Sequence, residues 1–215
     1  MTSSQIRNVL SPSERRIFRR LSTPQKIQNY LDTLPINFEL QGESNFSPRR
    51  VLKEKKAHCL EGAVFAAAAL AYRGQRPLLM DFRTTPQDED HVVALFRQDG
   101  LWGAISKTNH AILRYRDAIY RSPRELATSY FHEYLEWDGR KSLRSYSAPF
   151  DMRRYPLEQW ITAREDLHWL VEALDNTRHF PIAPKKILRQ LRRASNTELR
   201  AMKIVEWKRN GRRYK

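Results

Sequence analysis

The most constraining feature of this 215-residue chain is an alanine-rich run from Ala63 to Ala71 that contains no polar residue. Alanine has the highest helix propensity, and a helix that is apolar on every face is buried inside a domain. Gly74 follows, at a position where a left-handed residue commonly ends a helix. The sequence therefore predicts a central buried helix with Cys59 in its first turn.

Cys59 is the only cysteine of the chain. At a helix N-terminus, unpaired backbone N–H groups and the positive end of the helix dipole favour a thiolate, which is the reactive form of the side chain. A lone cysteine is more commonly a small buried hydrophobic residue. The position predicts a nucleophile only if other parts of the chain supply its chemical partners.

Composition limits the class of protein. A hydrophobic content of 40% is enough for a folded core, and no stretch of about 20 apolar residues is available to span a membrane. The first 20 residues do not have the pattern of a signal peptide, and a single cysteine excludes an internal disulfide. We expect a cytoplasmic protein with no membrane partner.

Several helices begin with a hydroxyl residue followed by proline, a pattern typical of helix N-termini. The starts at Ser11-Pro12, Thr23-Pro24 and Ser47-Pro48 precede Cys59, and the last of these opens a short basic helix over 48–55. Later segments predict strands over 77–82 and 141–148 and helices over 122–137 and 156–176.

The segment from Asp90 to Ser106 predicts a β-hairpin, with two apolar runs flanking Asp99-Gly100. A four-residue loop would place His91 directly opposite Ser106. A two-residue turn would place His91 opposite Thr108, with Ser106 as a diagonal neighbour. Because side chains alternate along a strand, His91 and Ser106 share a face in either register.

The net charge of +15 is concentrated near the C-terminus, since residues 184–215 contain twelve Lys and Arg against two Glu. Apolar residues recur at helical spacing there, which predicts two helices that dock on the domain or on a partner. A surface this basic attracts nucleic acid, an anionic membrane or an acidic protein, or is simply a solvated arm. We expect nucleic acid or an acidic protein as the possible partner of 184–215.

Cys59, His91 and Ser106 form the candidate catalytic set. In cysteine catalysis a histidine accepts the thiol proton and later protonates the leaving group, and a third group orients the imidazole. The other histidines lack companion ligands at metal spacing, and glycine-rich phosphate-binding motifs are absent. The sequence predicts neither a metal nor a cofactor.

The order and local pattern of residues 22–108 resemble the transglutaminase-like superfamily, a papain-like group that carries Cys, His and Asp in that order, and the chain would be a divergent, bacterial-type member. The resemblance rests on Cys59 with its small-residue helix, His91 at the head of a strand, and Trp102 shortly before the end of the next strand. Ser106 stands where this family usually has Asp. Asn109, Asp88 and Asp90 are alternative orienting residues.

The resemblance implies an α+β fold in which the cysteine helix packs on a small antiparallel sheet with flanking helices. We expect N-terminal helices over 1–46, a core over 47–180 and a basic helical tail over 181–215. The implied activity is that of a hydrolase or acyltransferase acting on a peptide or other amide through a Cys59 thioester. The alternative is a non-catalytic scaffold whose tail binds a polyanion.

Overall fold

The computed structural model describes residues 2–214 and has an α+β fold. Its sheet has the strand order β4-β3-β2-β1-β5-β7, with β6 also paired to β1, and every pairing is antiparallel. The strands are β1 (Leu78–Arg83), β2 (His91–Gln98), β3 (Leu101–Ile105), β4 (Arg116–Tyr120), β5 (Ser145–Ser147), β6 (Phe150–Asp151) and β7 (His179–Pro181). The predicted small antiparallel sheet is confirmed.

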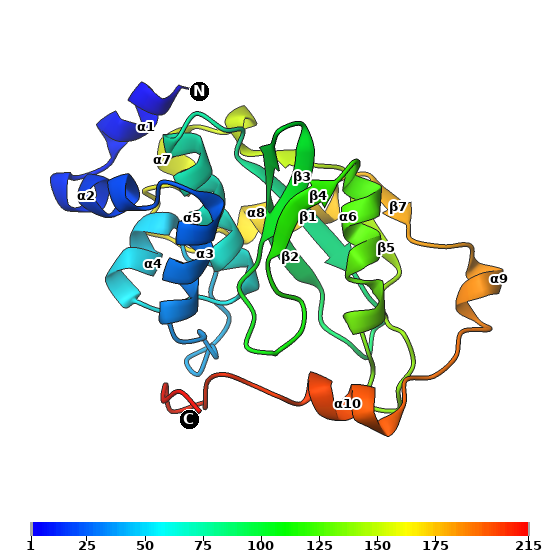
Figure 1. Cartoon of the computed structure of the whole chain (residues 1–215). Coiled ribbons are helices and arrows are strands. Elements are labelled where there is room, and N and C mark those ends of the chain that lie inside the picture. Colours follow the sequence, from blue (N-terminus) through cyan, green and yellow to red (C-terminus); the bar gives the residue numbers. More distant parts are fainter. Residues whose placement is uncertain (1, 215) are drawn as a thin grey trace.

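Helices cover both faces of the sheet (Figure 1). The helices are α1 (Ser3–Val9), α2 (Pro12–Arg20), α3 (Pro24–Thr33), α4 (Pro48–Glu54), α5 (Cys59–Tyr72), α6 (Pro123–Ser129), α7 (Leu157–Trp160), α8 (His168–Asp175), α9 (Lys185–Leu188) and α10 (Asn196–Met202). The larger core joins α1 to α5, α7 and α8 to one face, and the smaller core joins α6 to the other.

The alanine-rich run forms α5 as predicted. Every residue from Leu60 to Tyr72 is buried, and Gly74 has the left-handed conformation expected beyond a helix end, with φ of +86°. Four of the preceding helices pack around α5, whose small side chains let these elements approach closely. This packing fixes the N-terminal end of α5, and therefore Cys59, at one end of the sheet.

The hairpin has the two-residue turn. Ala94 pairs with Ile105 and Gln98 pairs with Leu101, and the turn residues Asp99 and Gly100 both have positive φ. Positive φ at both central positions matches the right-handed twist of the flanking strands. The register with a four-residue loop is therefore wrong, and Ser106 follows the end of β3 as a diagonal neighbour of His91.

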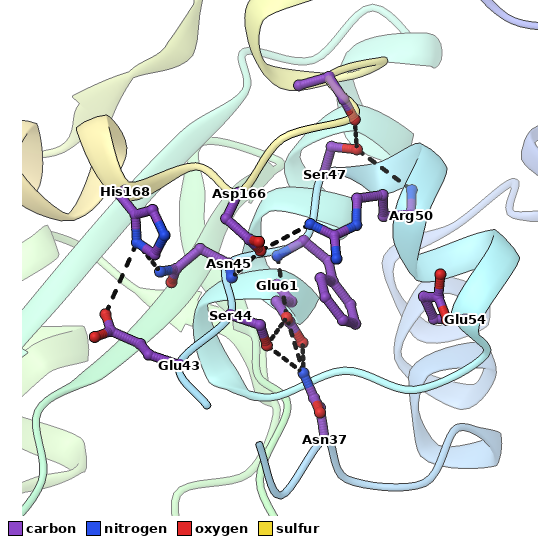
Figure 2. A network of polar contacts seen from close by, with 12 residues as sticks. Asn37, Glu43, Ser44, Asn45, Ser47, Arg50, Glu54, Glu61, Asp166 and His168 are labelled. Atoms are coloured by element: carbon purple, nitrogen blue, oxygen red, sulfur yellow. Dashed lines mark hydrogen bonds and ion pairs between the residues drawn. The ribbon is translucent and has the colours of Figure 1, made fainter. Parts of the chain in front are cut away.

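The long helix predicted over 156–176 is wrong. The chain forms α7 and α8 instead, and the segment between them hydrogen-bonds to the start of α4 (Figure 2). Ser47 Oγ donates to Ala163 O at 2.6 Å, and the Asp166 carboxylate accepts from Asn45 N at 2.7 Å and pairs with Arg50 at 2.8 Å. These long-range bonds replace the intrahelical bonds that the amphipathic pattern predicted.

Two other predicted elements also differ. The helix predicted over 122–137 ends at Ser129 and is followed by a single 3-10 turn, Phe131–Glu133, because the chain must bend to bury Tyr130 and Tyr134 in the smaller core. The strand predicted over 141–148 is only Ser145–Ser147. It lies between β1 and β7 rather than at the sheet edge, because β7, a strand that the sequence pattern did not reveal, pairs with its outer side.

The tail forms the two short helices α9 and α10 and then returns to the body of the molecule (Figure 1). Beyond α10, Val205 forms a bridge with His110, and Glu206 N donates to Asn109 O at 2.8 Å. The tail thus docks on the domain rather than extending freely. Within residues 2–214, no helix has the length and apolar character needed to cross a membrane.

Candidate active site

Cys59 opens α5 and is partly exposed at the wall of a cavity of about 360 Å³. As the first helical residue it has a backbone N–H with no partner inside the helix. His91, the first residue of β2, lines the same cavity. The fold therefore brings the predicted nucleophile and the predicted base to one site.

Ser106 is hydrogen-bonded to His91. The Ser106 Oγ lies 2.8 Å from His91 Nε2 and donates its own proton to Leu113 O at 2.5 Å. Because the hydroxyl proton is committed to that carbonyl, the oxygen accepts from a protonated Nε2. The Nδ1 atom of neutral His91 is then left with a lone pair, as a base for the thiol requires.

Gln28 of α3 holds Ser106 in place through its side-chain amide. Its Oε1 accepts from Ser106 N at 2.9 Å, and its Nε2 donates to Ser106 O at 2.8 Å. The same Nε2 donates to Asp32 Oδ1 at 2.8 Å, which fixes the orientation of the amide. Gln28 was not among the predicted site residues, since a single Gln on a helix face has no distinctive sequence signal.

The three alternative orienting residues make bonds elsewhere. The Asn109 side chain bonds the backbone of Trp207 through both its amide oxygen and nitrogen. Asp90 accepts from Thr84, and Asp88 accepts from Ser142. Although Asn109, Asp88 and Asp90 all line the cavity, Ser106 is the residue with a hydrogen bond to His91.

His58 is a further histidine at the cavity, which the candidate catalytic set did not include. The ring lines the cavity beside Cys59 because His58 is the N-cap of α5. Its Nδ1 accepts from Leu60 N at 3.2 Å and its Nε2 donates to Ser44 O at 2.8 Å. These two bonds fix the ring, so a second imidazole stands next to the sulfur.

The environment of Cys59 favours the thiolate. Burial alone raises the pKa of this thiol, but hydrogen bonds and charge from His58 and His91 outweigh it and hold the pKa well below its usual value. Burial also lowers the pKa of His58, yet Cys59 and Glu61 raise it to about 10. A protonated His58 carries a proton on Nδ1, so this nitrogen no longer accepts from Leu60 N.

Glu61, two residues after Cys59 in the first turn of α5, is a fully buried carboxylate within a network of polar contacts (Figure 2). It accepts from His58 N at 2.8 Å, from Phe46 N at 3.0 Å and from the side chains of Asn37 and Ser44. With His58 it forms a reciprocal capping box at the start of α5. Burial raises the pKa of Glu61 even though these donors act in the opposite direction. The sequence did carry a signal for Glu61, because it is the single acidic residue in the first turn of an otherwise apolar helix.

Lys107, next to Ser106, is buried in the wall of the cavity. Its Nζ donates to Leu31 O at 2.8 Å and Leu34 O at 2.5 Å, so that it caps the C-terminus of α3. Gly62 of α5 lies against the Lys107 stem, and a Cβ added at Gly62 would come 2.4 Å from Lys107 Cβ. The close approach of the two backbones depends on this glycine.

The tail forms part of the cavity wall. Arg209 lines the cavity from one side, and Glu39, Asp88 and Glu89 line it from others. The pairing of Asn109 with Glu206 and Trp207 anchors this segment.

No family model matches the chain, and no curated protein matches its sequence. Among residues 2–214, no cluster of three or more His, Cys, Asp or Glu has an arrangement that would hold a metal ion.

Proposed function

We propose that this protein is a cysteine-dependent amide hydrolase or acyltransferase of the transglutaminase-like, papain-like type. The observation that carries the proposal is that Cys59, a thiol of lowered pKa, lines one cavity with His91, whose ring is hydrogen-bonded through Ser106 to Leu113 O. A thiolate at a helix N-terminus with a fixed imidazole has the parts that nucleophilic catalysis needs. The substrate class is a peptide or another carboxamide, and a cytoplasmic location is part of the same proposal.

The first half-reaction forms a thioester. Nδ1 of His91 accepts the Cys59 proton, and the sulfur attacks the carbonyl carbon of the amide. The carbonyl oxygen becomes an oxyanion, which the free N–H of Cys59 is suited to bind. The C–N bond then breaks, and the imidazolium of His91 protonates the departing amine. The second half-reaction reverses these roles, with water giving the carboxylic acid or an amine giving a new amide.

Ser106 orients the imidazole but carries no charge. It therefore keeps Nε2 protonated without offsetting the positive charge that develops on His91, as a carboxylate would. In this scheme His58 compensates for the missing carboxylate, because it lowers the pKa of Cys59 and so favours the thiolate directly. The proposal assigns Cys59 as nucleophile, His91 as base and acid, and Ser106 and His58 as supporting groups.

The test separates acylation of the thiol from turnover of an amide. Intact-mass measurement after incubation with p-nitrophenyl acetate reports an acetyl adduct on Cys59, and peptidyl p-nitroanilides report amide cleavage. We expect an adduct that Cys59→Ser abolishes and that forms more slowly in His91→Ala. His110→Ala, at another histidine of the cavity wall, is expected to retain it. Added hydroxylamine distinguishes acyl transfer from hydrolysis.

An adduct that forms equally fast in His91→Ala, or no adduct and no anilide cleavage, would contradict the proposal. The second candidate function would then be preferred. In that function the same fold is a scaffold, and the basic tail binds nucleic acid or an acidic protein. The specific observation that favours it is a cationic cavity between residues 140–144 and the tail.

A further inference from the structure

A second cavity, distant from Cys59 along the chain, is lined mainly by cationic side chains. It has a volume of about 440 Å³, and we call it the basic cavity. Its walls come from the segment that leads into β5 and from α9 with the residues after it. The lining residues are Arg140, Lys141, Arg144, Lys185, Leu188, Arg189, Leu191 and Arg193. Six cations and no carboxylate face this space, so it is suited to an anion.

Half of these cations have no carboxylate partner within residues 2–214. Arg140 pairs with Glu136 and Asp138, and Arg193 also pairs with Asp138. In the described part of the chain, Lys185 and Arg189 have neither a side-chain hydrogen bond nor an ion pair, while Arg144 bonds only backbone carbonyls.

Lys141 provides a buried positive charge in the wall of the cavity. Its side chain is 5% exposed, its ion pair with Glu198 is long at 3.8 Å, and its hydrogen bond to His132 O is at the limit of 3.5 Å. Removing an ammonium from water without close partners costs free energy. An anionic oxygen in the basic cavity would supply the missing partner, and burial that lowers the pKa of Lys141 agrees with this need.

An exposed indole, Trp137, lies three residues before Arg140 of the basic cavity. Its ring lines a different cavity, whose wall also carries Asp88, Glu89, Glu133, Glu136 and Lys203. Trp137 is 76% exposed, the largest fraction among the exposed large hydrophobic residues, and Lys203 Nζ lies 5.7 Å from its ring centroid. Trp137 and Arg140 belong to one tight turn, in which Glu136 N donates to Arg140 O at 2.8 Å. The backbone places these two residues at most about 10 Å apart.

The turn is held by the tail itself. Ala194 N donates to Gly139 O at 2.8 Å, and the Asp138 carboxylate pairs with Arg193 at 3.1 Å. The turn that carries Trp137 is therefore bonded directly to the tail residues at the basic cavity. An exposed aromatic ring next to cations is the combination that binds single strands, because bases stack on the ring while phosphates pair with the cations.

We propose that the basic cavity and Trp137 form a binding site for single-stranded nucleic acid, with backbone phosphate in the cavity and a base on the indole. This inference rests on the proposed attraction of the tail to polyanions and is independent of catalysis at Cys59. A duplex hides the faces of its bases, so the indole favours a single strand. An acidic peptide or inorganic polyphosphate would use the cations without needing the ring.

Fluorescence anisotropy with a labelled single strand of about 12 nucleotides, a length that one site of this kind covers, tests the inference. Lys185→Ala combined with Arg189→Ala removes two cations that hold no structural bond. We expect weaker binding and a salt dependence whose slope falls by about 1.4, at about 0.7 per lost phosphate contact. Arg19→Ala combined with Arg20→Ala, two exposed arginines of α2, is the control with the same charge change and is expected to leave the slope unchanged.

Trp137→Ala tests the base contact. It is expected to weaken binding of the strand at least fivefold and to leave the affinity for inorganic polyphosphate unchanged, since stacking is worth about 1 kcal/mol or more per base. Cys59→Ser is expected to leave the affinity unchanged, which keeps this test separate from the enzymatic proposal. The inference is overturned if the single strand does not bind at low salt, or if the arginine control loses as much affinity as the Lys185 and Arg189 variant. It is also overturned if Trp137→Ala leaves the affinity for the strand unchanged, or if a duplex or polyglutamate binds as tightly as the strand.

Discussion

His91 Nε2 lies 2.8 Å from the hydroxyl oxygen of Ser106, and that hydroxyl donates to Leu113 O. The pair fixes the orientation of the imidazole, and in the neutral form of the ring it leaves Nδ1 with a free lone pair. A neutral partner orients the ring as a carboxylate would, but it does not stabilise the ring after protonation. The acid–base behaviour of this site therefore depends on the sulfur and its two histidines together.

The first prediction concerns the Cys59 thiolate. Because Cys59 is the only cysteine, the rate of alkylation by iodoacetamide reports on one group. The rate is expected to reach its plateau below the usual thiol pKa of about 8.5. Both His58→Ala and His91→Ala are expected to move the midpoint upward, since each removes a group that lowers the pKa of Cys59. A native midpoint equal to that of the urea-unfolded chain would contradict this.

Gln28 is predicted to act as a positioning residue. Gln28→Leu removes the two bonds that hold the Ser106 backbone and leaves buried groups unpaired, at a cost of about 1–3 kcal/mol in the free energy of unfolding. If its role is positional, the alkylation midpoint of Cys59 also shifts toward that of His91→Ala. Gln25→Leu, at an exposed position of α3, is the matched control. A loss of stability with no change in the midpoint would show a structural role only.

Lys107 is predicted to make stability depend on alkaline pH. Burial lowers its pKa to about 8 from 10.5, so between these values the unfolded chain binds a proton that the folded chain has released. The contribution of Lys107 to the free energy of unfolding therefore rises across this window, by about 3 kcal/mol at most. Below about pH 8 Lys107 is protonated in both the folded and the unfolded chain, so its contribution to the free energy of unfolding does not change with pH.

Urea unfolding across this pH range measures the effect. Lys107→Met is expected to lack the rise, whereas Lys53→Met, with a side chain that is 80% exposed in the native protein, is expected to keep it. Parallel profiles for the native protein and Lys107→Met would show that Lys107 does not release its proton in this window.

Gly62→Ala is predicted to destabilise the protein. In a solvent-exposed helix this change adds about 1 kcal/mol of stability, but here the new Cβ would come 2.4 Å from Lys107 Cβ. Relieving that clash requires α5 and the end of β3 to separate, at a cost of about 1–3 kcal/mol. Urea unfolding measures the change, and the alkylation rate of Cys59 reports whether the site shifts with the backbone. An unchanged or higher midpoint of unfolding would contradict this account.

The sequence by itself determined the elements whose signals are local. Ser47-Pro48 and the alanine-rich run are enough to start α4 and α5, because capping and helix propensity act within a few residues. Asp99-Gly100 marks where the hairpin turns, but it left the loop length open. Alternation along the strands also placed His91 and Ser106 on a common face.

Only the tertiary structure decided which of two registers the hairpin has, where the helix predicted over 156–176 breaks, and which side chains complete the site. Asp166 takes its partners from residues more than a hundred positions earlier, and Gln28 reaches Ser106 across 78 positions. Such bonds leave no periodic trace in a sequence, because their strength depends on burial and on the approach of distant segments. His58, Gln28 and Lys107 therefore became visible as parts of the site only when the chain was folded.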